Sequence, residues 1–268
     1  MRRRRPEGLP TRGKTAPDRL RRLDAFLSLY DPALLAPWGR LASGVCVDLG
    51  FGRLPLTTVQ LLRTLRRHDP GARVIGVELD PERVAAAEPY AGPGLTFRRG
   101  GFNLPLEPGE GVRLIRAMNV LRQYPPERCV GTHADLVAQL LPGGLLLEGT
   151  SDPFGQVMAV SVMRRRGDAP HLEALLFATN MRQGGHPDIF PPVLPRHLIQ
   201  RMVPGEPIFR FFERWRHAWA CAAPAGSFGE RQRWARAAEI LADDWPGVLA
   251  QRRWLRRGML VWRNPPYP

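Results

Sequence analysis

Between residues 45 and 150, short apolar runs alternate with amphipathic segments, and this alternation constrains the fold more than any other feature of the sequence. Apolar runs typical of buried strands occupy residues 45–49, 73–78, 95–97, 112–117 and 145–148. Helical spacing of leucine and other apolar residues predicts helices over 57–67, 81–88 and 133–141. Strands that alternate with helices form crossover units, so the pattern predicts a mainly parallel sheet with helices on both faces.

The pattern changes on both sides of this region. A helix is predicted over 18–30, and two strand-like runs at 157–164 and 172–179 flank a Gly167-Asp168 turn. These two runs predict an antiparallel hairpin that closes one side of the sheet. After residue 191 the chain is Pro-rich, then helical, with a helix over 228–243 and a short strand over 258–262. We therefore predict an α/β fold in three parts, which are a basic flexible arm (1–18), an α/β core (19–190) and a helical cap or extension packed on the core (191–268).

A glycine loop directly follows the first predicted strand, in the sequence Val47-Asp48-Leu49-Gly50-Phe51-Gly52. Glycines at these positions let the backbone turn tightly and approach a ligand closely. The dinucleotide fingerprint requires a third glycine, and Pro55 stands at that position. The loop therefore disfavours a nicotinamide or flavin enzyme. An acid two residues before the first glycine favours a ligand with a positively charged end and no phosphates.

The loop and two later features resemble the class I S-adenosylmethionine-dependent methyltransferases. Asp48, Gly50 and Gly52 match the acid-x-Gly-x-Gly motif of that family, and Glu78 stands where the family places an acid that holds both ribose hydroxyls. A Pro-Gly-Gly at 142–144 precedes the fifth strand. The resemblance covers residues 40–180 and implies a Rossmann-like fold, S-adenosylmethionine as cofactor and methyl transfer to a nitrogen or oxygen acceptor.

The loop after the third strand departs from the family pattern. Residues 98–105 contain no acid that would bind the adenine amino group, and Leu54 replaces a further glycine of the first motif. Phe102 is expected either to stack on adenine or to lie in the core, and Asn103 to hydrogen-bond the adenine edge. The cofactor-binding residues implied by the resemblance are Asp48, Gly50, Gly52, Glu78, Leu79, Gly101, Phe102 and Asn103.

Acceptor-binding residues are expected just past the fourth strand, at the carboxyl edge of the sheet. The segment 116–126 is unusually polar for a strand exit. We predict catalytic roles for Asn119, Tyr124 and Arg116, with Gln123 and Arg122 as further candidates for orienting an acceptor or holding an anionic one. The alternative is a helix capped by Asn119 with a solvated arginine face. Glu148 is expected to point toward the same cleft or to be structural.

Metal, membrane and targeting signals are missing from the sequence pattern. The six histidines show no HxxxH or HxH spacing, and the three cysteines show no CxxC, so no metal site is predicted. No apolar run is long enough for a membrane span or a secretory signal, which predicts a cytoplasmic protein without a membrane partner. Asn264-Pro265-Pro266-Tyr267 matches a strand-four tetrapeptide of amino-methyltransferases, but residues 112–117 already fill that strand. We therefore interpret it as a proline-rich tail.

The net charge of +14, from 39 basic and 25 acidic residues, has two interpretations. It indicates a polyanionic partner, or it reflects a GC-rich coding bias toward arginine. Arginines interleaved with Trp234 and Trp254 suit RNA, although a solvated helix face with a tryptophan core fits as well. The stripe of Phe211, Trp215 and Trp219 is predicted to be core. The acceptor therefore stays open between a small molecule and RNA, and the alternative function is a catalytically inactive, methyltransferase-like nucleic-acid-binding module.

Overall fold

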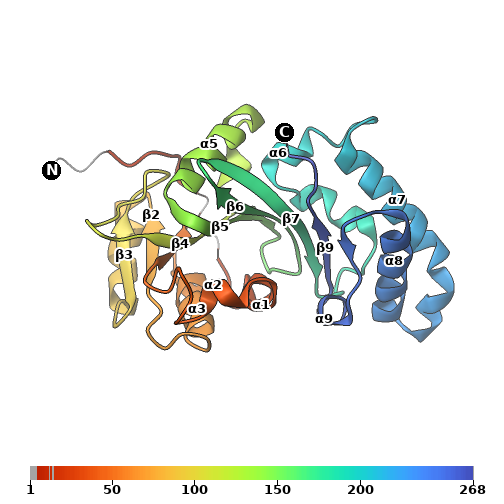
Figure 1. The fold of residues 1–268 in the computed structure, drawn as a ribbon, viewed down its shortest axis with the longest axis horizontal. Helices are drawn as coiled ribbons and strands as arrows, with labels where there is room; N and C mark the ends of the chain where they lie inside the picture. The colour runs from red at the N-terminus through yellow and green to blue at the C-terminus, as the bar shows by residue number, and fades with distance from the viewer. Residues whose placement is uncertain (1–4, 12, 14, 268) are drawn as a thin grey trace.

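One continuous, twisted sheet runs through the part of the chain that the computed structural model describes, residues 5–11, 13 and 15–267 (Figure 1). Nine strands of these residues form it in the order β3-β2-β1-β4-β5-β6-β7-β9-β8. Their bounds are β1 Val45–Leu49, β2 Val74–Glu78, β3 Leu95–Arg99, β4 Val112–Met118, β5 Leu140–Ser151, β6 Val157–Arg166, β7 Ala169–Thr179, β8 Val248–Leu249 and β9 Met259–Arg263.

The first five strands are parallel, and the last four pair antiparallel. The parallel core β3-β2-β1-β4-β5 is Rossmann-like, which confirms the predicted fold class. The chain moves outward from β1 to β3 and then returns to place β4 on the other side of β1. This reversal creates a topological switch point between β1 and β4, where open α/β sheets bind their ligands.

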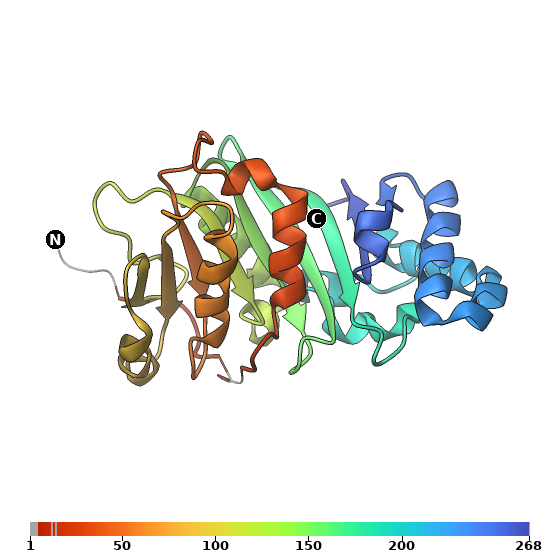
Figure 2. The same cartoon turned by 90° about the horizontal axis from the view of Figure 1, so that it is seen from below.

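Helices cover both faces of the sheet, and the two faces bury separate apolar clusters. One face packs against α5, α6, α7 and α8, and the other against α1, α2, α3 and α9; α1 and α3 lie in front of the sheet in Figure 2. The helix bounds are α1 Arg21–Tyr30, α2 Pro32–Leu35, α3 Leu56–Leu65, α4 Pro81–Ala87, α5 Pro126–Ala138, α6 Arg196–Ile199, α7 Pro207–Cys221, α8 Glu230–Asp244 and α9 Arg252–Leu255.

The predicted helix over 133–141 was misplaced. Helix α5 begins at Pro126, a residue that suits the first turn of a helix, and ends at Ala138. The Pro-Gly-Gly does not stop a helix but lies inside β5, where Leu140 already pairs with Val112. Gly143 adopts a left-handed φ of +87° there, and the register between β4 and β5 shifts at this point. The glycine therefore accommodates an irregularity within a strand that is longer than predicted.

The segment after residue 190 forms helices that cover the sheet and also contributes strands β8 and β9 to it. Strand β9 pairs with β7, so the predicted hairpin β6–β7 is confirmed but the sheet continues beyond it. The predicted aromatic stripe on α7 is confirmed as core, and Phe211 stacks on Trp262 of β9 with ring centroids 4.4 Å apart. Trp234 and Trp254 are also buried. The C-terminal tryptophans therefore hold α7, α8 and α9 against the sheet.

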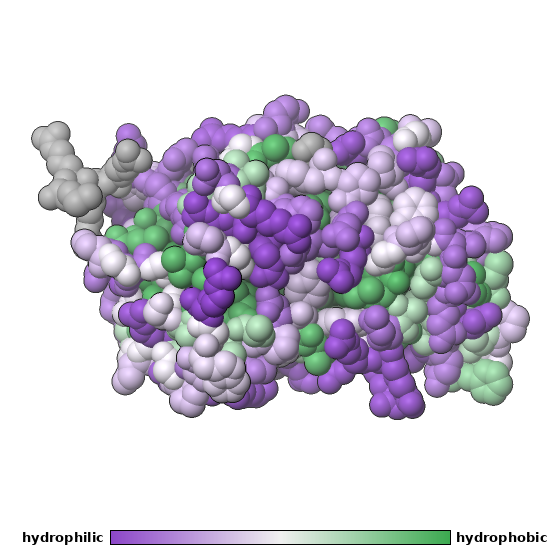
Figure 3. Space-filling view, viewed as in Figure 1, coloured by the Kyte–Doolittle hydropathy of each residue, from purple (hydrophilic) through white to green (hydrophobic). Residues whose placement is uncertain are grey.

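The outer surface is predominantly hydrophilic on the face shown in Figure 3, where hydrophobic side chains gather only in small, separated patches. No helix within the described residues combines the length and the apolar character needed to cross a membrane. Arg2, Arg3, Arg4, Arg12 and Lys14 of the predicted basic arm lie outside the described residues.

Candidate functional site

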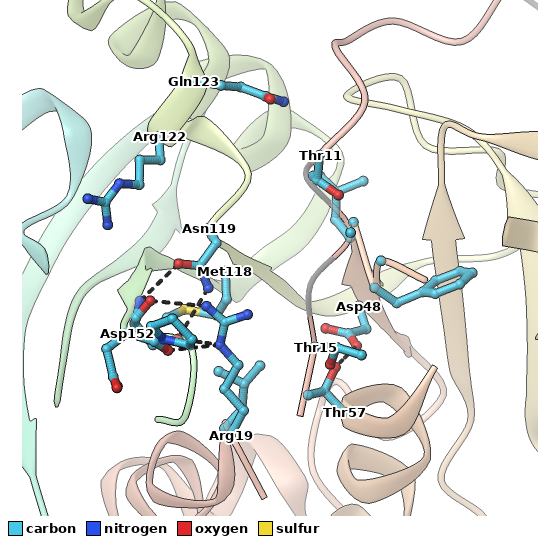
Figure 4. Close-up of a pocket in the computed structure, with 18 residues that line it drawn as sticks. Thr11, Thr15, Arg19, Asp48, Thr57, Met118, Asn119, Arg122, Gln123 and Asp152 are labelled. Carbon is cyan, nitrogen blue, oxygen red and sulfur yellow. Dashed lines mark hydrogen bonds between the residues drawn. The ribbon is translucent and has the colours of Figure 1, made fainter. Parts of the chain in front are cut away.

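A cavity of about 470 Å³ opens at the switch point between β1 and β4 (Figure 4). Its volume lies within the range of small-molecule sites. The loops that follow β1, β4 and β5 line it, together with the N-terminal arm, the residues just before α1 and Thr57 of α3. The polar side chains that line it include Thr11, Arg19, Asp48, Thr57, Asn119, Arg122, Gln123, Ser151 and Asp152.

The glycine loop forms one wall of the cavity. Gly50 and Gly52 have φ values of +73° and +83°, in the left-handed region that favours glycine. A Cβ atom on Gly50 would lie 2.8 Å from Cγ2 of Val120, so a side chain there would also clash with the loop after β4. Both predicted glycines therefore satisfy a backbone requirement at the cavity wall.

Glu78 ends β2 beside this loop and is buried. One carboxylate oxygen accepts a hydrogen bond of 2.9 Å from the Gly52 N–H, and the other accepts one of 2.9 Å from the Leu79 N–H. Arg83 lies 3.7 Å from the first of these oxygens. The Asp80 N–H donates to the second oxygen as well, at 3.4 Å. An ionised carboxylate offers about four lone-pair sites, so Glu78 ties the glycine loop to β2 and keeps about one of these sites for a ligand hydroxyl.

The N-terminal arm lies across the predicted adenine side of this crevice. The Phe102 N–H donates to the Glu7 carbonyl oxygen at 2.8 Å. The Asn103 side chain accepts from the Glu7 N–H at 2.8 Å and donates to the Arg5 carbonyl at 2.9 Å. A Cβ atom on Gly101 would lie only 1.8 Å from the Glu7 carbonyl oxygen. The Asn103 amide, expected to bind adenine, therefore binds the protein's own backbone, and the Phe102 ring lies in the core as the alternative expectation had it.

The arm then continues past the loop that follows β4. The Leu9 N–H donates to the Tyr124 hydroxyl, and the Gln123 side chain donates to the Leu9 carbonyl at 2.8 Å. Beside Glu78 the arm leaves a cavity of only about 20 Å³, which has room for about one water molecule. In Figure 4 the segment that carries Thr11 passes between Gln123 on one side and Asp48 on the other.

Asp48 lines the cavity and also belongs to a buried charge triad with Arg116 and Asp24. Arg116 Nε donates to Asp48 at 2.8 Å, and Arg116 Nη1 donates to Asp24 at 2.5 Å. Its third donor binds the Thr57 carbonyl at 2.8 Å, and Thr58 donates its hydroxyl to Asp48 at 2.7 Å. Arg116 is fully buried, so its guanidinium binds α1 and β1 rather than the surface of the cavity.

The triad has two carboxylates and only one guanidinium, and the pKa values of Asp24 and Arg116 are shifted as a result of burial and of these charges. Burial raises the pKa of Asp24 from 3.8 to about 6, with Asp48 adding to the rise and Arg116 opposing it. Burial lowers the pKa of Arg116, but Asp48 and Asp24 outweigh that effect and raise it above its ordinary value. Arg116 therefore stays charged, and Asp24 is the group that takes up a proton.

We expect the unfolding free energy to fall, relative to an Asp24→Asn variant, as the pH rises from 4 to 7. The pKa of Asp24 is higher in the folded state than in the unfolded state, so protonated Asp24 favours the fold. This contribution to the unfolding free energy is complete below pH 4 and is lost as the pH rises through about 6. The loss is on the order of 2–3 kcal/mol at about 1.4 kcal/mol per pH unit. Urea titrations across this range measure it, and Asp168→Asn, at a fully exposed side chain, is the control. Parallel curves for wild type and Asp24→Asn would contradict the expectation.

The predicted catalytic residues occupy three different environments. Asn119 lines the cavity with a left-handed φ of +62°, and its side chain exchanges hydrogen bonds of 3.2 and 3.1 Å with Ser151. Tyr124 is buried, packs on Phe102 and binds the arm. Arg116 lies in the triad. Only Asn119 of the three therefore borders the large cavity.

Sequence reasoning missed the opposite wall of the cavity. Arg19 donates to the Ser151 hydroxyl and to the Asp152 carbonyl, each at 3.0 Å. The further candidates Arg122 and Gln123 do line the cavity, and within the described residues no hydrogen bond or ion pair engages the Arg122 guanidinium. Arg19 and Ser151 are distant in sequence, so no local pattern could pair them. Glu148 lies away from the cavity, beside His133 of α5 at 3.4 Å.

Solved structures that resemble this chain match only part of it. The CcbJ methyltransferase of Streptomyces caelestis is 19% identical with a TM-score of 0.37, and the match covers 61% of this chain and 66% of CcbJ. Magnesium protoporphyrin IX methyltransferase of Synechocystis PCC 6803 is 21% identical with a TM-score of 0.35, and the match covers 48% of this chain and 52% of that enzyme. CalS10, an amino pentose methyltransferase of Micromonospora echinaspora, is 18% identical with a TM-score of 0.34, and the match covers 58% of this chain and 66% of CalS10.

These structural neighbours are S-adenosylmethionine-dependent methyltransferases. The chain spans between about half and two thirds of their length. No family model matches the sequence, and no curated protein matches it. The strand order and the loops described above, rather than these partial alignments, are therefore the basis for assigning a function to the cavity.

Proposed function

We propose that this protein binds S-adenosylmethionine at the β1–β4 switch point and transfers its methyl group to a nitrogen or oxygen atom of a small molecule. The observation that supports this most is the ligand-sized cavity between the glycine loop and Asn119. The cofactor, when bound, supplies an electrophilic methyl group. The protein must mainly hold donor and acceptor in line, because a well-oriented bound pair avoids most of the entropic cost of a bimolecular reaction.

Glu78 and the glycine loop are the proposed contacts of the cofactor. The Glu78 carboxylate accepts a ribose hydroxyl, and the tight turn at Gly50 and Gly52 admits the methionine end into the cavity. Phe102 and Asn103 border the adenine position, which the arm covers. Cofactor binding therefore requires residues 5–9 to leave the crevice.

The proposed acceptor is a small molecule with an anionic group. Arg122 borders the cavity with an exposed side chain that makes no hydrogen bond or ion pair with the described residues, and an available guanidinium there favours an anionic acceptor. The Asn119 amide, fixed by Ser151, is placed to orient the reacting atom. An RNA acceptor is less favoured because Trp234 and Trp254, the expected stacking side chains, are buried.

The Glu78→Gln variant tests the cofactor proposal. An amide replaces the charged acceptor for a ribose hydroxyl, so affinity for S-adenosylhomocysteine should fall about tenfold or more. Isothermal titration calorimetry on the full chain measures the loss. Glu82→Gln, four positions along the chain and exposed, is the matched control and should bind as wild type does.

Two results would count against the proposal. The first is a failure of both wild-type protein and a variant that lacks the arm to bind S-adenosylhomocysteine at millimolar concentration. The second is equal affinity of Glu78→Gln and Glu82→Gln for S-adenosylhomocysteine. The first result would favour a non-catalytic module whose own arm fills the crevice.

A further inference from the structure

Three ionisable side chains from distant parts of the chain meet in the interior, on the face of the sheet covered by α5 and α6. His133 lies on α5, Glu148 on β5 and His197 on α6, and all three are buried. Their ligand-type atoms lie within 4.8 Å of one another. None of the three lines the cavity at the switch point. The cluster is therefore separate from the proposed methyl-transfer site.

The polar atoms that face one another have no hydrogen-bond partner among the described residues. These atoms are His133 Nε2, Glu148 Oε2 and His197 Nδ1, and the other ring nitrogen of His197 has no partner either. A buried polar atom without a partner destabilises a fold by about 1–3 kcal/mol, and more when it is charged. Three such atoms around one point, one from each side chain, indicate that something else occupies the space between them.

The geometry and the chemistry of these atoms suit a transition-metal ion. His133 Nε2 lies 3.4 Å from Glu148 Oε2, which is about the edge of a tetrahedron with bonds of 2.0–2.1 Å. His197 Nδ1 lies 3.9 Å from the same oxygen and needs to approach by about half an ångström. Imidazole nitrogen and carboxylate oxygen atoms are both ordinary ligands of zinc.

A hydrogen-bond partner for His133 lies beside the cluster. The second ring nitrogen of His133, Nδ1, lies 3.0 Å from the Tyr267 hydroxyl. When Nε2 binds a metal, Nδ1 keeps its proton and donates it to an oxygen of this kind, which fixes the orientation of the ring. Tyr267 belongs to the tetrapeptide interpreted as a proline-rich tail. The tail thus reaches back to the cluster.

We propose that His133, Glu148 and His197 bind one zinc ion, with Tyr267 orienting His133. Two imidazoles and one carboxylate favour zinc or another first-row divalent metal over calcium and magnesium, which prefer oxygen ligands. The three ligands are buried and lie away from the cavity, so the role proposed for the ion is structural, with a water molecule at its fourth coordination position. It links β5, α5 and α6 and holds the C-terminal tail beside them. This proposal reverses the expectation, based on sequence spacing, that the chain has no metal site.

Zinc content and thermal unfolding of the full chain test the proposal. Protein is stripped with a chelator, incubated with zinc and desalted, and the metal is measured by elemental analysis. We expect about one zinc per chain in wild type and a rise in Tm of about 5–10 °C on zinc addition. His197→Gln and Glu148→Gln should retain no zinc and show no zinc-dependent rise.

The controls separate this site from surface binding and from misfolding. His217 and Cys221 form an exposed pair on α7, 3.6 Å apart, that offers zinc an adventitious site. His217→Gln should therefore keep both the zinc and the Tm rise. Glu148→Gln removes a buried charge, so its metal-free Tm should equal or exceed that of metal-free wild type. Metal-free wild type that takes up no zinc, zinc retained by Glu148→Gln, or zinc lost from His217→Gln would overturn the proposal.

Discussion

The chain that lacks residues 1–9 should bind S-adenosylhomocysteine at least about tenfold more tightly than the full chain. In the full chain, the arm must first release the hydrogen bonds that Glu7 makes with Phe102 and Asn103 and that Leu9 makes with Tyr124 and Gln123. At a net 0.5–1.5 kcal/mol for each bond, the open form is a minor population, and the apparent affinity falls by that fraction. Calorimetry on the two chains measures the ratio.

A shorter deletion distinguishes blocking of the crevice by the arm from an effect of the arm's positive charge on cofactor affinity. Removing residues 1–4 eliminates Arg2, Arg3 and Arg4 but leaves the segment from Arg5 to Thr11 that crosses the crevice. This variant should bind S-adenosylhomocysteine as the full chain does. If removal of residues 1–9 leaves the affinity unchanged or weakens it, the arm does not exclude the cofactor from the crevice.

Arg116 is expected to contribute strongly to the free energy of unfolding. Its replacement by methionine should lower the free energy of unfolding by about 3–5 kcal/mol at pH 7, because Asp24 and Asp48 would remain buried without their counter-charge. Urea unfolding followed by circular dichroism measures the change. The loss should shrink toward pH 4, where Asp24 is protonated in the folded state and needs less compensation.

Two further variants make the Arg116 result specific. Arg63→Met, at an exposed position of α3, should change stability by no more than about 0.5 kcal/mol. Arg116→Met combined with Asp24→Asn should recover part of the loss, since one of the two uncompensated carboxylates is gone. A loss below about 1 kcal/mol for Arg116→Met alone would show that the triad does not hold α1 to the sheet.

The triad also explains why one predicted role could not be derived correctly from sequence position. Arg116 stands at the end of β4, where acceptor-binding residues are expected, but its side chain enters the interior toward Asp24 of α1. The direction of a side chain in a strand depends on which face it occupies, and the polar segment 116–126 shows no clear alternation. Asn119, only three residues later, does border the cavity.

The sequence by itself determined the parallel α/β core and the glycine loop. Strand and helix periods are local, and a left-handed turn favours glycine, so Gly50 and Gly52 could be recognised from neighbouring residues. Tertiary structure alone decided the rest. The arm meets Phe102 and Asn103, Arg116 meets Asp24, and His133 meets Glu148 and His197 only after the chain has folded. Local spacing does not encode such contacts, because they depend on which buried polar groups the packed sheet and helices bring together.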